Sequence, residues 1–186
     1  RRKPHPERYA GRQTMNWKAV IRLYRAKHYP NHVAEMEQFQ KQPSLLQAID
    51  RAALAQDADD KRFDHQRRLK QVTLNEAKEK LLEAEKRIGE CRAFDDLLIQ
   101  VEETLAGIRG QGKLYRYDSA LRIGAWLGLS PDTVYLHAGT RDGAVKLGIS
   151  GERRSVSKNE LPEPLRSLSA AEIEDILCIF KGRIEA

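Results

Sequence analysis

The sequence is poor in cysteine, in aromatic residues and in long apolar runs, and these shortages exclude several classes of protein. Cys91 and Cys178 are its only cysteines, too few for a disulfide framework or for a zinc site made of cysteines, and both are expected to be buried thiols. No apolar run approaches the roughly 20 residues that a membrane span needs, and the charged, proline-bearing amino end is unlike a signal peptide. We therefore expect a soluble, intracellular protein with no membrane partner.

Common cofactor and metal signatures are also missing. The sequence contains no P-loop, no dinucleotide-binding fingerprint and no nucleophile elbow. His28 and His32 have the spacing of metal ligands on a helix, but Pro30 lies between them and no nearby His-Glu pattern completes a site. We therefore predict neither a metal ion nor a cofactor.

Charge of neither sign dominates the chain, but basic residues gather at its amino end. The 186 residues include 33 Lys and Arg against 27 Asp and Glu, a net charge of +6. Residues 1–30 contain nine basic residues and a single acid, Glu7. This segment is either a solvated tail or a phosphate-contacting face, and for the second role we single out Arg22 and Arg25, on a predicted helix beside Trp17.

Hydrophobic spacing predicts an all-α protein, because apolar residues recur every three or four positions and strict alternation is rare. With 40% hydrophobic residues, the chain can form one compact helical domain over residues 1–186. Side chains suited to helix capping mark the starts of several expected helices: Asn16, Pro43 with Ser44, the capping-box spacing of residues 73–76, Ser130 to Asp132, and a second capping box at residues 169–172. The first helix should end near Pro30, and a short one should follow Asn31.

A glycine-rich segment separates two of the expected helices. Phe94, Leu97 and Leu98 belong to a helix that precedes it, and Ala120 and Leu121 to one that follows, which predicts a helix-hairpin-helix. Glycines in such a hairpin let backbone N–H groups face a phosphate at the start of the next helix. The residues expected to contact DNA are Arg109, Gly110, Gln111, Gly112, Lys113 and Arg116, together with Arg22, Arg25 and Arg141.

The residues after the second of these helices contain the other polar candidates. We expect residues 130–137 to begin a helix that carries Val134 and Tyr135, and residues 139–151 to be a loop with a short helical turn. The polar run at residues 137–142 is unusual for a core segment, so it is expected to line a site.

Residues 92–148, centred on the glycine segment, resemble the helix-hairpin-helix DNA glycosylase superfamily. The resemblance implies that the hairpin grips a phosphate and that a downstream carboxylate attends a flipped nucleotide. Lys113 stands near the lysine of the strand-cutting members, and Asp132 follows it at about the family's separation. Tyr135 replaces the family's aspartate when His137 is aligned, so the resemblance leaves either Asp132 or Asp118 as the acid.

Cleavage of an N-glycosidic bond explains why such residues are needed. Positive charge develops on the sugar, and a carboxylate stabilises it and orients water. Lys113 could instead attack the sugar carbon to form a Schiff base, and His137 is a further catalytic candidate. The candidates for holding the flipped base are Tyr115, Tyr117, Tyr135 and Thr140.

Each candidate also has a structural alternative. Asp118 could cap a helix that begins at Ser119, and Asp132 could be a first-turn acid that complements a helix dipole. Lys113 could contact phosphate only, and His137 could be a satisfied structural histidine.

The leading hypothesis from the sequence is a DNA glycosylase that binds duplex DNA, flips out a damaged or modified base and leaves an abasic site. One candidate substrate is the hypermodified cytosine of phage genomes, which implies a bacterial, nucleoid-associated defence enzyme without an obligate protein partner. One alternative is a non-catalytic helix-hairpin-helix module that tethers a partner to DNA. Another is a helical interaction protein that binds another chain through residues 73–105.

Overall fold

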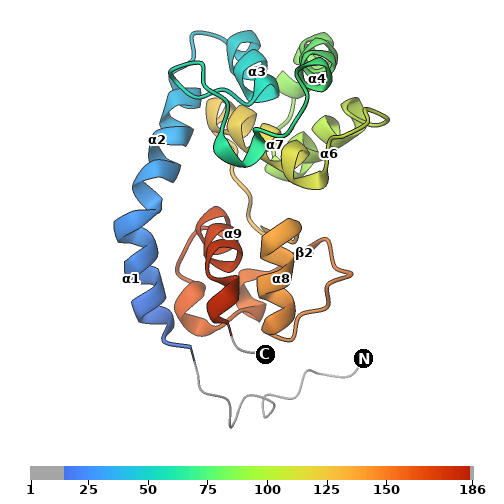
Figure 1. Ribbon diagram of the computed structural model, residues 1–186. Helices are drawn as coiled ribbons and strands as arrows, with labels where there is room; N and C mark the ends of the chain where they lie inside the picture. The colour runs from blue at the N-terminus through green and yellow to red at the C-terminus, as the bar shows by residue number, and fades with distance from the viewer. Residues whose placement is uncertain (1–14, 185–186) are drawn as a thin grey trace.

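Helices make up most of residues 15–184, the part of the chain that this computed structural model describes (Figure 1). The mostly helical prediction is therefore confirmed. The α-helices are α1 (Trp17–Lys27), α2 (Tyr29–Gln40), α3 (Leu45–Leu54), α4 (Gln71–Glu83), α5 (Glu85–Gly89), α6 (Phe94–Thr104), α7 (Lys113–Leu127), α8 (Ala138–Lys146) and α9 (Ala170–Ile179). Short 3-10 turns lie at η2 (Asp64–Gln66), η3 (Lys158–Glu160), η4 (Glu163–Leu165) and η5 (Lys181–Arg183). No helix within residues 15–184 is both long and apolar enough to cross a membrane.

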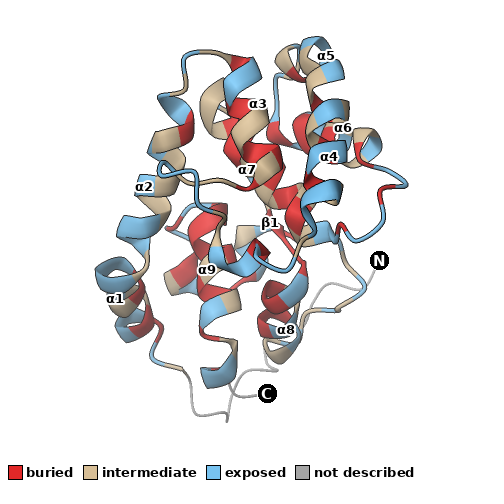
Figure 2. Cartoon of the chain, turned by 45° about the horizontal axis from the view of Figure 1, so that its top comes forward, coloured by how far each residue is buried: buried red, intermediate tan, exposed pale blue. Residues whose placement is uncertain are grey.

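The helices enclose two hydrophobic clusters. The first is formed by α3 to α7 with Phe39 at the end of α2, and the second by α1, α8, α9 and the segment between the last two (Figure 1). Figure 2 shows the buried faces of α3 and α7 in the first cluster and of α9 in the second. The helices α1 and α2 run past both groups, separated only by His28. The junction of the two clusters is where polar side chains from distant segments meet.

Several helix starts agree with the sequence. The Asn16 side chain accepts a hydrogen bond from the Ala19 N–H at 3.1 Å, and Ser44 caps α3 in the same way. The predicted capping box at Ser169 and Glu172 is present, with both reciprocal hydrogen bonds formed. Such caps satisfy backbone N–H groups that have no partner inside the helix, which is why they can be recognised locally.

The start of α4 was predicted wrongly. The helix begins at Gln71, so Thr73 lies inside its first turn, and the side chain of the N-cap residue, Lys70, makes no capping hydrogen bond. The Arg62 guanidinium holds the preceding turn by donating to the Leu69 carbonyl at 2.8 Å and to the Gln71 side chain. This contact depends on the folded loop, and the capping-box pattern gave no sign of it.

Residues 130–146 also differ from the prediction. Val134 and Tyr135 form the strand β1 (Val134–Tyr135) instead of a helix, and β1 pairs antiparallel with β2 (Ser155–Val156). The physical reason is that β1 passes between the two clusters. Tyr135 packs into the first, whereas Val134 and Leu136 pack into the second. Successive side chains of a strand point to opposite sides, which a helix cannot provide.

The predicted loop over residues 139–151 begins with the helix α8. Two glycines let α8 lie directly against α9, because a Cβ at Gly139 would be 2.6 Å from the Cys178 Sγ and a Cβ at Gly143 would be 2.4 Å from the Leu177 carbonyl oxygen. The glycines that suggested a loop are therefore sites of close helix packing.

We predict that Gly143→Ala lowers the free energy of unfolding by about 2 kcal/mol, because the new methyl group must displace the α9 backbone. Chemical denaturation measures this change. Gly182→Ala is the matched control, since no other described residue has an atom within 4 Å of the Cβ position there, its chain neighbours aside. Equal stability of the two variants would contradict the close packing of α8 on α9.

Candidate functional site at the junction of the two clusters

Asp118 is held at the junction by a segment more than 50 residues earlier in the chain. Its Oδ2 accepts a hydrogen bond from Gln66 Nε2 at 2.8 Å and lies 3.0 Å from His65 Nε2. The Asp118 side chain is 15% exposed, so it is sheltered but still open to solvent. Because α7 already begins at Lys113, Asp118 lies within the helix and does not cap one that begins at Ser119.

Arg122, one turn further along α7, supports this arrangement from inside the protein. Its guanidinium is 1% exposed and donates to Glu35 Oε1 and to Gln66 Oε1, both at 2.8 Å. The same group lies 4.0 Å from the centre of the Phe63 ring. Since arginine can only donate, the orientation of the Gln66 amide is fixed, with its Nε2 directed to Asp118. We call Glu35, Arg122, Gln66, Asp118 and His65 the Asp118 chain.

A second group of buried side chains lies at the same junction. The rings of Tyr117 and His137 are 4.4 Å apart between centroids, and the two residues are 3% and 5% exposed. Within residues 15–184, no group makes a hydrogen bond to the Tyr117 hydroxyl or to either His137 ring nitrogen. Glu174 Oε1 lies 3.4 Å from His137 Nε2, and its hydrogen bond comes from Thr140 Oγ1 at 2.8 Å.

The Tyr117 hydroxyl and the two His137 ring nitrogens are buried at one place without a hydrogen bond to the described residues, and His137 Nε2 has only the longer contact to Glu174. Most buried polar atoms in native proteins have a partner, and the exceptions require an explanation such as binding or catalysis. Tyr117 lies on α7, whereas His137 directly precedes α8. We refer to Tyr117, His137, Thr140 and Glu174 as the Tyr117 cluster.

Asp175 connects the Tyr117 cluster with the first two helices. Its Oδ2 accepts a hydrogen bond from the Tyr24 hydroxyl at 2.8 Å and lies 3.4 Å from His32 Nδ1. Tyr24 belongs to α1 and His32 to α2, whereas Asp175 follows Glu174 on α9. This contact fixes α9 against the long α1 and α2 pair.

Burial and charge shift the protonation of these groups in different directions. Burial raises the pKa of Glu174 well above its usual range, and the neighbouring Asp175 raises it further. Burial lowers the pKa of His137, whereas the hydrogen bond to Asp118 raises the pKa of His65. The Asp118 charge also raises the pKa of His137 and of Glu174, so the Asp118 chain and the Tyr117 cluster lie within electrostatic reach of each other.

The structure brings together some of the predicted site residues. Asp118, Tyr117, His137 and Thr140 all lie at the junction. Sequence reasoning missed their partners in both groups, namely Glu35, His65, Gln66, Arg122, Glu174 and Asp175. The one available signal was Arg122, a charged residue between the apolar neighbours Leu121 and Ile123 of a predicted helix.

Other predicted site residues lie elsewhere. Asp132 is exposed in the loop before β1. The Tyr115 hydroxyl donates to the Ala53 carbonyl at 2.6 Å inside the first cluster, and burial raises its pKa to about 12. The Tyr135 hydroxyl donates to Asp95 Oδ1 at 2.6 Å, and Arg141 donates to the Leu136 carbonyl.

The loop between α6 and α7 contains the glycines that were predicted to turn backbone N–H groups toward a phosphate. Gly107 and Gly110 have φ values of +85° and +88°, which other residues rarely adopt. Within residues 15–184, no group accepts a hydrogen bond from the backbone N–H groups of residues 110–113. Arg109, Gly110, Gly112 and Lys113 are exposed, whereas Gln111 is buried and donates to the Thr73 carbonyl at 3.3 Å. Arg116 Nη2 donates to the Leu105 carbonyl at 3.3 Å and so braces the loop.

The predicted basic face on α1 is also exposed. Arg22 and Arg25 point outward together with Lys18, and Arg25 lies 3.6 Å from Glu172. The other basic residues expected at the amino end, including Arg1, Arg2, Lys3, Arg8 and Arg12, lie outside the described residues.

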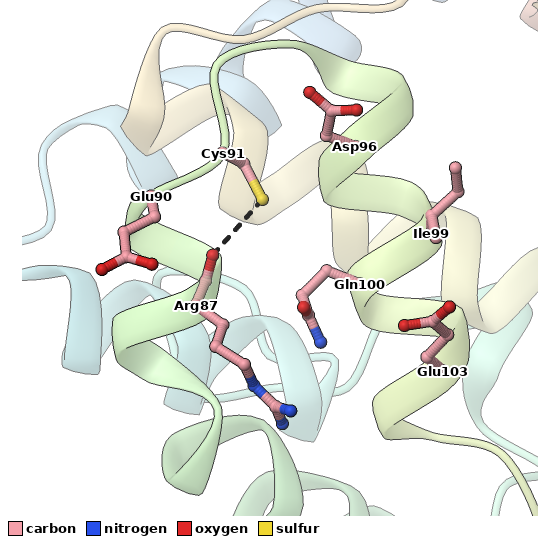
Figure 3. Close-up of a pocket in the computed structure, with 7 residues that line it drawn as sticks. All are labelled: Arg87, Glu90, Cys91, Asp96, Ile99, Gln100 and Glu103. Atoms are coloured by element: carbon pink, nitrogen blue, oxygen red, sulfur yellow. Dashed lines mark hydrogen bonds between the residues drawn. The ribbon is translucent and has the colours of Figure 1, made fainter.

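A surface pocket of about 280 Å³ lies between α5 and α6 (Figure 3). Arg87 and the acids Glu90, Asp96 and Glu103 line it, and Cys91 Sγ lies 3.5 Å from the Arg87 carbonyl oxygen. The pocket shares no residue with the Asp118 chain or the Tyr117 cluster, so it is a separate feature. No group of His, Cys, Asp and Glu within residues 15–184 is arranged to hold a metal ion.

Neither the family models, nor the curated proteins, nor the solved structures gave a match to this chain.

We predict that Glu174→Gln stabilises the protein at pH 8 and that this gain shrinks toward pH 5. Because the pKa of Glu174 is raised on folding, its ionisation in the unfolded state removes stability as pH rises above the unfolded pKa. Glutamine keeps the acceptor for Thr140 without an ionisable group, so a gain of about 1 kcal/mol at pH 8 is expected. Chemical denaturation at both pH values measures it. The exposed Glu163→Gln serves as control, and a pH-independent difference for Glu174→Gln would contradict the assignment.

We also predict that Asp118→Asn lowers the pKa of the His65 imidazole. The raised pKa of His65 comes mainly from its hydrogen bond to the Asp118 carboxylate, which the amide replaces with a neutral group. An NMR pH titration of the histidine ring protons measures the shift. Asp132→Asn makes the same chemical change at an exposed position and should leave His65 unaffected.

Proposed function

We propose that this protein binds duplex DNA, receives a flipped nucleotide at the junction of the two hydrophobic clusters and hydrolyses its N-glycosidic bond, with Asp118 as the catalytic carboxylate. One observation carries the proposal. Both hydrogen-bonding partners of Asp118 contact its Oδ2, and no described residue makes a hydrogen bond to its Oδ1. A partly sheltered carboxylate therefore keeps one oxygen for a reacting group.

The chemistry requires such a carboxylate. As the bond to the base breaks, positive charge develops on the sugar, and a fixed negative group nearby stabilises that charge without reorganising. The Oδ1 atom can also orient a water molecule for attack on the sugar carbon. Gln66 and His65 hold the other oxygen and so keep the carboxylate in place.

The Tyr117 cluster is suited to hold the base. The rings of Tyr117 and His137 lie against each other and are nearly buried, so a base would reach their polar atoms only after the two rings separate. Thr140 fixes one oxygen of Glu174. Under this proposal His137 contacts the base, and does not act as the group that activates water.

The exposed backbone at the start of α7 supports DNA as the partner. Free N–H groups at residues 110–113 can bind a phosphate, and Lys113 at the first helical position adds positive charge. Asp118 follows on the same helix, roughly 8 Å along its axis from Lys113. A phosphate bound at the loop and the Asp118 carboxylate would be separated by this axial distance, with Asp118 turned about 140° around the helix from Lys113. The exposed Lys113 fits phosphate contact better than attack on the sugar.

The alternative is a DNA-binding module without activity, because the free N–H groups and basic residues would serve it equally well. A module without activity does not explain why, among the described residues, the Tyr117 hydroxyl and the His137 ring nitrogens form no hydrogen bond. These buried polar atoms therefore favour the enzyme. The hypermodified cytosine of phage DNA is one candidate for the excised base.

The experiment is to incubate the protein with unmodified, deaminated, alkylated and glucosylated phage DNA and to measure alkali-labile breaks. We expect breaks in at least one of these DNAs. Asp118→Asn should reduce their rate by about 100-fold or more, while DNA affinity is kept. Asp132→Asn is the control and should cleave at the normal rate. Normal cleavage by Asp118→Asn would exclude the proposed role of this carboxylate.

A further inference from the structure

The start of α4 lies beside the loop that precedes α7. The Gln111 amide donates to the Thr73 carbonyl at 3.3 Å, and a Cβ at Gly110 would be 3.9 Å from Thr73 Oγ1. Neither N-cap residue, Lys70 of α4 or Gly112 of α7, provides a side-chain cap. Two uncapped helix N-termini therefore lie next to each other on the surface.

Exposed basic side chains surround these two helix starts. Arg67, Arg68 and Lys70 precede α4, and Arg109 and Lys113 flank the start of α7. Among residues 15–184, Arg68 and Lys70 form no ion pair, and Arg67 contacts only the exposed Asp64, at 3.6 Å. Of the acids at residues 57–60 just upstream, Asp59 is near Lys61 and Asp60 is paired with Arg51. The cations beside the helix starts are thus largely uncompensated.

Two further features suggest that this surface meets a partner. Gln111 lies between the two helix starts and is only 8% exposed. Its side-chain Oε1 accepts no hydrogen bond from the described residues. Val72, on the first turn of α4, is 70% exposed, more than any other large apolar side chain in the described part. An exposed apolar residue among cations suits a ligand with both charged and apolar surfaces, which a nucleic acid provides.

We propose that Arg67, Arg68 and Lys70, together with the loop at residues 105–112, form one continuous surface that binds the phosphate backbone of duplex DNA. The inference rests on the DNA-binding part of the proposed function and is independent of hydrolysis. Cationic side chains and free helix N–H groups are the donors that most often contact DNA phosphates. A membrane surface is the poorer match, because it would require a broad apolar face, and Val72 is a single side chain.

The surface also adjoins the candidate site along the chain. His65 and Gln66, which hold Asp118, directly precede Arg67. DNA bound by Arg67 and Arg68 would therefore contact the segment that positions the carboxylate. This makes the segment at residues 64–72 a second DNA contact beside the loop before α7.

The test compares two double variants with the same loss of charge. Arg67→Ala/Arg68→Ala removes the proposed contacts, and Lys86→Ala/Arg87→Ala removes an exposed basic pair on α5, beyond the other end of α4 and roughly 20 Å away. Binding of a labelled 30-base-pair duplex of random sequence is followed by fluorescence anisotropy between 50 and 200 mM salt. The first variant should lose about 10-fold in affinity, and its salt slope should fall by about 0.9 for each phosphate contact removed. The control should bind like the wild type.

Each outcome decides the proposal. Equal affinity of the two double variants, with folding verified by thermal unfolding and with Arg67→Gln/Arg68→Gln giving the same result, would overturn it. Absence of wild-type DNA binding, or binding to anionic vesicles instead, would overturn both this inference and the proposed function. Selective loss of DNA binding in the first variant, without abasic sites formed by the wild type, would support this surface and reject hydrolysis.

Discussion

The buried guanidinium of Arg122 is the interaction on which the candidate site depends. It is 1% exposed and lies between Glu35 of α2, Gln66 of η2 and the Phe63 ring. A buried charge is tolerated only when it is paired and hydrogen-bonded, and loss of one partner typically costs about 3–5 kcal/mol. The positions of α2, η2 and α7 are therefore tied together. Through Gln66, this constraint also fixes the oxygen of Asp118 that faces the protein.

The ionisable and polar groups buried at the junction lower the stability of the folded protein, as is common at functional sites. Burial disfavours the ionised form of Glu174 and the charged form of His137, and three polar atoms of Tyr117 and His137 form no hydrogen bond within residues 15–184. Burial of apolar side chains in the two hydrophobic clusters offsets the loss of stability at the junction. Perturbed titratable groups are typical of functional sites, and here they accompany a carboxylate whose Oδ1 forms no hydrogen bond with the described residues.

Local features of the fold could be predicted, and long-range ones could not. Asn16, Ser44 and Ser169 mark helix starts because a cap involves only neighbouring residues. The strand at Val134 and the glycine packing of α8 depend on elements that no local pattern reveals. The site follows the same rule. Asp118, Tyr117, His137 and Thr140 could be named from the sequence, but Gln66 and Glu35 reach α7 across 52 and 87 residues. Gly110 and Lys113 could be expected to be exposed, because loop geometry is also local.

The central claim is that the Asp118 carboxylate stabilises positive charge on a sugar. Its most direct test is the affinity for two duplexes that differ at one position, where a cationic pyrrolidine or a neutral tetrahydrofuran replaces the sugar. Transition-state analogues bind more tightly than neutral counterparts, so we expect the pyrrolidine duplex to bind about 100-fold more tightly. Asp118→Asn should remove this preference without changing affinity for the neutral duplex. Equal affinity of the wild type for the two duplexes would contradict the account.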